Sequence, residues 1–216
     1  MLFRLRMPPP PPRKRPWYLV ASLLAALAFG VGGGCEGYGD VAFFRGARMD
    51  IGPLLAVGND ADRVSVTETF DQWTTVLDAA KARAFPIGVA GMLVGVTIMI
   101  FAMRAMAGRT GARNALVQLV IAQVGVGIIS FAMLRDARDA QHEFYAATVR
   151  AQAHEVATPE SAAETDIVAR YYIAAHKFVP PLLLALQAIS SALIILALTR
   201  PRSREFFEAT ADPAIE

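Results

Sequence analysis

Long apolar stretches without charged residues alternate with polar connections along this chain of 216 residues. The stretches comprise residues 17–34, 85–103, 115–134 and 178–199, and none of them contains Asp, Glu, Lys, Arg or His. The hydrocarbon core of a bilayer is about 30 Å thick, a distance that a helix of about 20 apolar residues spans. The pattern therefore predicts an all-α, polytopic membrane protein with four transmembrane helices.

The connection of residues 35–84 changes character along its length. It begins with a glycine-rich part, for which we expect irregular structure because glycine lets a helix stop and the chain turn. From about Ser65 the apolar residues, Phe70 and Trp73 among them, recur at spacings of three and four, which is the period of a helix. This helix is expected to continue towards the second apolar stretch and to bend at Pro86.

The connection of residues 135–177 predicts a helical hairpin. Its first half continues the third membrane helix outwards, and its second half begins with Thr158 as N-cap and Pro159 at the first helical position. The second half leads into the fourth apolar stretch, where Pro180 and Pro181 predict a kink. Both long connections thus predict a helical extension on one side of the membrane, whose candidate packing residues are Phe70, Trp73, Tyr171 and Tyr172.

Basic residues predict which way the chain crosses the membrane. The Pro-rich tail of residues 1–16, the short loop of residues 104–114 and the start of the tail of residues 200–216 are rich in arginine. Residues 35–84 and 135–177 contain most of the acidic residues. Because Lys and Arg favour the cytoplasmic side, we expect cytoplasmic N- and C-termini and two periplasmic connections. The excess of arginine over lysine is typical of GC-rich bacteria, so the expected location is the bacterial inner membrane.

Cys35, the one cysteine of the chain, raises the question of whether the first helix is retained. It follows a basic segment, an apolar stretch and small residues, as in a lipoprotein signal. However, Gly32 stands where such signals usually have a leucine-like residue, and Gly30 and Gly34 form a small-xxx-small step that suits helix packing in membranes. We interpret residues 17–34 as a retained helix; cleavage and lipidation at Cys35 is the alternative.

Small and polar residues within the apolar stretches suggest two kinds of contact. Small residues one turn apart predict faces on which helices pack closely; these helix-packing residues are Gly88, Gly91, Gly95, Ala188 and Ala192. Polar side chains at depth either form hydrogen bonds between helices or line an aqueous pore; they are Gln118, Gln123, Gln187, Ser190 and Ser191.

The residue types argue against several kinds of membrane chemistry. Proton-driven machines use ionisable residues within the membrane, and haem needs axial ligands, commonly histidine. The apolar stretches contain neither. His142 and His154 lie about 18 Å apart along one expected helix, so they cannot share a metal ion, although His176 could approach one of them across the hairpin. We therefore expect no catalytic residue, no cofactor, no metal site and no nucleic-acid partner.

These observations favour an integral inner-membrane protein without catalysis of its own, acting as a subunit, scaffold or accessory of an envelope assembly. The expected partners are membrane lipids and either other membrane protein subunits or further copies of the chain. Two alternatives remain open. One is a small homo-oligomeric channel or transporter whose pore is lined by the polar residues of the third and fourth helices. The other is a membrane enzyme that uses the outer histidines and carboxylates.

Overall fold

The computed structural model describes residues 15–45, 50–56, 58–158 and 162–210. The described residues form seven helices: α1 Trp17–Phe44, α2 Gly52–Leu55, α3 Asp60–Met106, α4 Thr110–Met133, α5 Arg135–Val156, α6 Ala162–Thr199 and α7 Pro201–Thr210. Four of them, α1, α3, α4 and α6, are long and apolar enough to cross a membrane. The predicted all-helical chain with four such helices is therefore confirmed. The basic tail of residues 1–14 and the predicted helix start at Pro159 lie outside the described residues.

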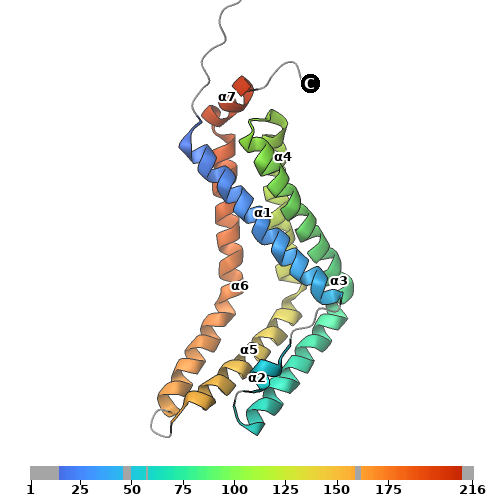
Figure 1. Ribbon diagram of the computed structural model, residues 1–216, viewed down its shortest axis with the longest axis vertical. Coiled ribbons are helices and arrows are strands. Elements are labelled where there is room, and N and C mark those ends of the chain that lie inside the picture. Colours follow the sequence, from blue (N-terminus) through green and yellow to red (C-terminus); the bar gives the residue numbers. More distant parts are fainter. Residues whose placement is uncertain (1–14, 46–49, 57, 159–161, 211–216) are drawn as a thin grey trace, which may run out of the picture.

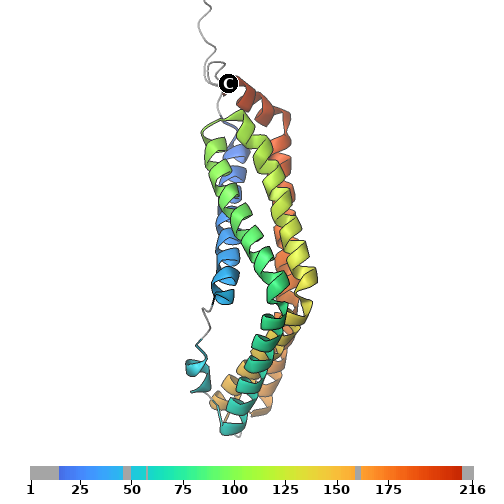
Figure 2. The ribbon, with the colours of Figure 1, turned by 90° about the vertical axis from the view of Figure 1, so that its right-hand side faces the viewer.

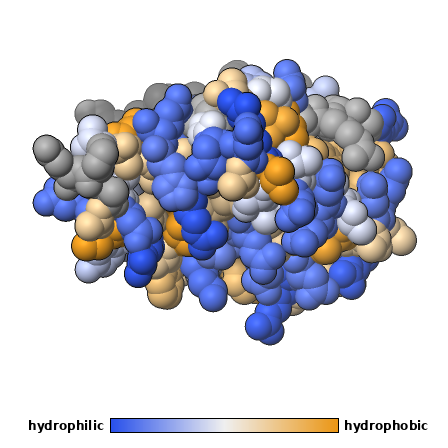
Figure 3. Space-filling model, turned by 90° about the horizontal axis from the view of Figure 1, so that it is seen from below, coloured by the Kyte–Doolittle hydropathy of each residue, from blue (hydrophilic) through white to orange (hydrophobic). Residues whose placement is uncertain are grey.

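The molecule consists of an upper bundle and a lower extension (Figures 1 and 2). The bundle contains α1, α4 and the apolar parts of α3 and α6, and the extension contains α5 and the polar parts of α3 and α6. With 47 residues, α3 is about 70 Å long, more than twice the thickness of the hydrocarbon core. Viewed from below, the end of the extension is mostly hydrophilic (Figure 3). The extension is thus built like a water-exposed helical domain.

The helices change direction where the bundle meets the extension. Pro86 lies inside α3, Pro180 and Pro181 lie inside α6, and Leu134 separates α4 from α5. Proline removes a backbone hydrogen bond and bends a helix, and the break at Leu134 has the same effect on the path of the chain. The extension consequently leaves the bundle at an angle (Figure 1).

The glycine-rich residues after the first apolar stretch continue the helix instead of ending it. α1 runs on from Gly34 to Phe44, so the irregular structure expected there is wrong for residues 35–44. The physical reason is contact with α3. A Cβ atom at Gly95 would lie 2.4 Å from the backbone nitrogen of Gly34, a distance that no real side chain allows. Glycine permits the two backbones to touch, and such close packing stabilises helix pairs in membranes.

Basic residues of the described chain lie at one end of the bundle: Arg15 precedes α1, the arginine-containing loop joins α3 to α4, and α7 begins after Arg200 (Figure 1). The guanidinium carbon of Arg15 lies 5.5 Å from the ring centroid of Phe206, and that of Arg200 lies 5.1 Å from the ring of Tyr18. The C-terminal tail was expected only as a cytoplasmic segment, but residues 201–210 form α7, and Phe206 and Phe207 are buried.

Aromatic side chains make the core of the extension. Trp73 of α3 stacks on Phe144 of α5 with ring centroids 5.5 Å apart, and Phe70 contacts both rings. Tyr171 and Tyr172 behave differently, since they are 73% and 63% exposed. Two of the four candidate packing residues therefore lie in the core of the extension, and the other two lie on its surface.

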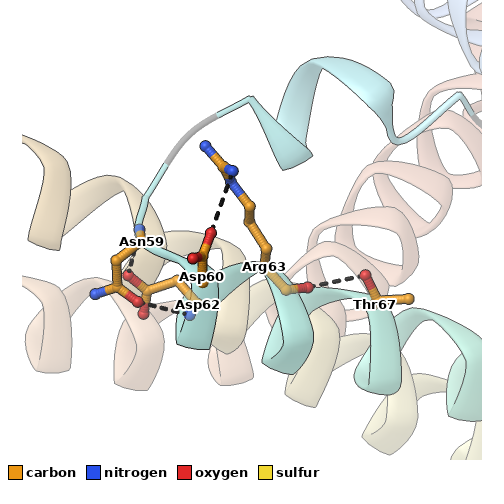
Figure 4. A network of polar contacts seen from close by, with 5 residues as sticks. All are labelled: Asn59, Asp60, Asp62, Arg63 and Thr67. Carbon is orange, nitrogen blue, oxygen red and sulfur yellow. Dashed lines mark hydrogen bonds and ion pairs between the residues drawn. The ribbon is translucent and has the colours of Figure 1, made fainter.

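The outer end of α3 is closed by a capping box. Asn59 and Asp62 each accept a hydrogen bond from the other's backbone N–H (Figure 4), so α3 begins at Asp60 rather than at about Ser65 as expected. The Asp62 carboxylate also contacts His154 of α5, with Oδ1 and Nδ1 2.9 Å apart. The Asp62 side chain thus caps the start of α3 and also joins this helix to α5.

The glycine contact predicts a difference between two neighbouring substitutions on α1. A Cβ at Gly37 would lie 2.4 Å from the backbone nitrogen of Met92, whereas a Cβ at Gly39 has nothing within 4 Å. Gly37→Ala should lower the free energy of unfolding by about 1–3 kcal/mol through overpacking. Gly39→Ala should leave it unchanged or raise it by up to about 1 kcal/mol, because alanine favours helices. Thermal unfolding in detergent measures both, and equal midpoints would contradict the contact.

The continuity of α1 also predicts the state of Cys35. Residues on both sides of this exposed cysteine pack against α3, so cleavage before it would remove half of the contact. We expect the purified protein to have an intact mass of 23.2 kDa without a lipid adduct. A shorter, lipid-modified species that disappears on Cys35→Ser would show that the first helix is a signal.

Candidate functional site

A cavity of about 620 Å³ lies where α1, α3, α4, α5 and α6 meet. Leu134 and Pro180 line it, so it sits at the level where the helices change direction. Its volume is within the range of about 300–1,000 Å³ that is typical of ligand sites. Because parts of four membrane-compatible helices form its walls, a molecule in this cavity would lie at the end of the bundle that adjoins the extension.

Two glutamine amides lie in the walls of the cavity. Gln123 of α4 is directed at Gly33, where a Cβ would lie 2.2 Å from the amide nitrogen. Gln187 of α6 lies against Gly127, where a Cβ would lie 2.9 Å from the amide oxygen. Gln123 is only 5% exposed, and its Oε1 has no hydrogen-bond partner among the residues that the structure describes. A buried amide with a free acceptor favours a ligand or water that can donate.

Carboxylates enter the cavity because α1 is longer than expected. Glu36 and Asp40 are one helical turn apart and both line the cavity. Asp40 is half-buried beside α3: a Cβ at Gly88 would lie 2.8 Å from the Cβ of Asp40. Gly88 belongs to the charge-free part of α3, so an acid lies beside an apolar membrane segment. Ionisable groups in such positions are costly and commonly functional.

A single cation lines the cavity on the α5 side. The guanidinium carbon of Arg138 lies 3.9 Å from the ring centroid of Phe131, which holds the side chain against the wall. Burial lowers the pKa of Arg138 from its usual value, but a guanidinium starts so far above neutrality that it stays charged. The charges of the lining residues are therefore two carboxylates and one guanidinium.

The predicted helix-packing and polar residues differ in burial and in whether they line the cavity. Gly88, Gly91 and Gly95 are buried on α3, whereas Ala188 and Ala192 are exposed on α6. Gln123 and Gln187 line the cavity, and the buried Ser191 hydroxyl donates to the Gln187 carbonyl at 2.8 Å. Gln118 and Ser190 point outwards and are exposed. Within one chain the five polar side chains thus do not line a common path.

The three histidines are divided between two contacts. The Nδ1 atoms of His142 and His176 lie 3.5 Å apart across α5 and α6, and the ring of Tyr145 stacks on His176 at 3.7 Å. His154 instead contacts Asp62. Among the described residues no group of three or more His, Cys, Asp or Glu side chains is placed to hold a metal ion. The expected approach of His176 to one of the other two histidines is confirmed, and its partner is His142.

A second feature is an exposed apolar face along α6, which we call the outward stripe. Its members alternate at spacings of three and four residues and are exposed throughout: Val168, Tyr171, Ala175, Phe178, Leu182, Ala185, Ile189, Ala192 and Leu196. This is the spacing of a coiled-coil seam. Ile194 and Leu198, on the opposite side of α6, are buried in the bundle. The stripe therefore faces away from the rest of the chain.

The cavity carboxylates were missed at the sequence level because the first membrane helix was expected to end at Gly34. One signal pointed to the longer helix. Small or apolar residues recur at spacings of three and four across the cysteine and are buried on one face of α1: Gly30, Gly33 or Gly34, Gly37 and Val41.

Comparison of the chain with known protein families, curated proteins and solved structures finds no match.

The unpartnered amide of Gln123 predicts how two substitutions change stability. Gln123→Met keeps the length of the side chain and removes the buried acceptor. The free energy of unfolding of the purified protein should therefore rise by about 1–3 kcal/mol, and its unfolding midpoint should rise as well. Gln123→Glu places a charge in the same space, so the midpoint should fall. Both are measured by thermal unfolding in detergent. A lower midpoint for Gln123→Met would mean that the amide already has a partner.

Proposed function

We infer that the chain is a non-catalytic structural subunit of an assembly in the bacterial inner membrane, with both termini in the cytoplasm. The outward stripe of α6 is the observation that carries this proposal. It offers a helical seam that nothing in the described part of the chain covers. The orientation is supported by the basic residues of the described chain, because Arg15, the arginines around the α3–α4 loop and those at the start of α7 lie at one end of the bundle.

Lipid accounts for only part of the outward stripe. The charge-free part of α6 begins at Phe178, and Val168 lies ten residues before it, about 15 Å further along the helix. The headgroup region adds only about 5–7 Å on each side of the hydrocarbon core. Val168 and the neighbouring Ile167, each 53% exposed, therefore extend an apolar surface beyond the lipid. Such a surface outside the membrane favours a protein partner.

The partner that fits this stripe is a second copy of the chain. Two copies inserted with the same topology have parallel α6 helices at equal depth, so each position of the stripe meets its equivalent. A twofold pair of this kind is the commonest form of oligomer. Ala175, Ala185 and Ala192 allow close approach between the larger side chains, and Ala188 flanks the same surface. The continuous seam then spans both the membrane and the extension.

Disulfide cross-linking in native membranes tests this contact. In a chain with Cys35→Ser, we expect Ile189→Cys and Tyr171→Cys to give an oxidised product of two chains, each of 23.2 kDa. Leu93→Cys is the matched control, because Leu93 of α3 is 57% exposed and Ile189 is 58% exposed, but Leu93 lies outside the stripe. It should give little or no product.

Two outcomes contradict the proposal, and a third changes the partner that it names. Cross-linking at none of the positions means that the stripe faces lipid. Equal cross-linking at positions 93 and 189 means random collision. Products that contain other proteins, identified by mass spectrometry, retain the structural role but replace the second copy with a foreign subunit.

A further inference from the structure

The walls of the cavity carry a net negative charge, and one of the two acids that supply it, Asp40, is half-buried. Glu36 and Asp40 supply two carboxylates and Arg138 one guanidinium, so the ionised lining residues carry one net negative charge. Asp40 is half-buried against Gly88 in the apolar part of α3. In such surroundings an unbalanced charge attracts a counter-charge more strongly than it would in water. The charge that would complete this set is a single positive one.

Aromatic side chains from two helices surround the same region. Phe43 and Phe44 end α1, and Trp73 of α3 lies 6.3 Å from Phe43, ring centroid to ring centroid. Aromatic faces attract organic cations, most strongly when the cation carries little water. The other cation of the cavity, Arg138, is already held over Phe131. The α1 side, with its two acids and two phenylalanines, is therefore where an incoming cation is favoured.

Much of the remaining wall of the cavity is apolar, although it also includes Ser130 and glutamine side chains. Ile87, Val126, Leu183 and Leu184 line it, and the free Oε1 of Gln123 adds an acceptor but no positive charge. An apolar body can occupy this part while its charge stays near the carboxylates. Inorganic cations, which hold their hydration shell tightly, do not match these walls.

We propose that the cavity between α1, α3, α4, α5 and α6 binds a lipophilic organic cation, with its charge beside Asp40 and Glu36 and its apolar part against α4 and α6. This site does not depend on the α6 contact, because the outward stripe lies on the other side of that helix. In this proposal the positive charge of Arg138 opposes that of the ligand and weakens binding of the cation.

Two probes of equal shape and opposite charge test the proposal. Tetraphenylphosphonium and tetraphenylborate are measured by equilibrium dialysis against the full chain in neutral detergent. We expect saturable binding of tetraphenylphosphonium and no saturable binding of tetraphenylborate. Asp40→Asn should weaken phosphonium binding about tenfold, or about 1.4 kcal/mol in binding free energy, because it removes the charge of the half-buried carboxylate. Asp71→Asn, on an exposed part of α3, should leave it unchanged.

Arg138→Gln gives the most specific result. A cation site predicts tighter phosphonium binding once the guanidinium is removed, whereas a site for a phosphate or another anion predicts the reverse. Equal uptake of both probes by the wild-type chain, or unchanged affinity in a folded Asp40→Asn variant, overturns the proposal. If Asp40→Asn does not fold, the direction of the change in Arg138→Gln decides the question.

Discussion

The close contact between the backbones of α1 and α3 determines much of the rest of the structure. Glycine in a helix costs about 1 kcal/mol relative to alanine, so a run of helical glycines needs compensation. The contact between Gly34 and Gly95 provides it, since the two backbones approach to distances that exclude any side chain. Van der Waals packing of this kind replaces the hydrophobic effect, which is absent between helices in lipid.

This contact has a chemical consequence, because α1 continues along α3 beyond the charge-free stretch that ends at Gly34. Asp40 is thereby held beside an apolar part of α3, where a carboxylate is expensive, and the exposed Glu36 lines the same cavity one turn earlier. The cost is limited because both side chains border a cavity at the edge of the bundle, close to the bend. The same contact thus brings α1 to the cavity, and α1 supplies both acidic residues among the described residues that line it.

The helices of the chain are packed unequally. α1 and α3 form an intimate pair, and Trp73 and Phe144 join α3 to α5 in the extension. α6 is held more loosely, by the pair of His142 and His176, by Gln187 against Gly127 and by a few buried residues near α7. One whole side of α6 remains uncovered, including the part that precedes its charge-free segment. A helix attached in this way is suited to contact another molecule.

The sequence by itself determined the helical class, the four apolar segments and the helical nature of the extension. These follow from local rules: a bilayer requires about 20 charge-free residues, and spacings of three and four mark a helix. The tertiary structure alone decided where α1 ends, since the glycines at residues 30–37 suit either a turn or a close helix contact until α3 is in place. It also decided that Trp73 is packed while Tyr171 is exposed, and that Gln123 faces a cavity while Gln118 faces outwards. Burial of a side chain depends on which helix lies opposite, and that is a property of the assembled bundle.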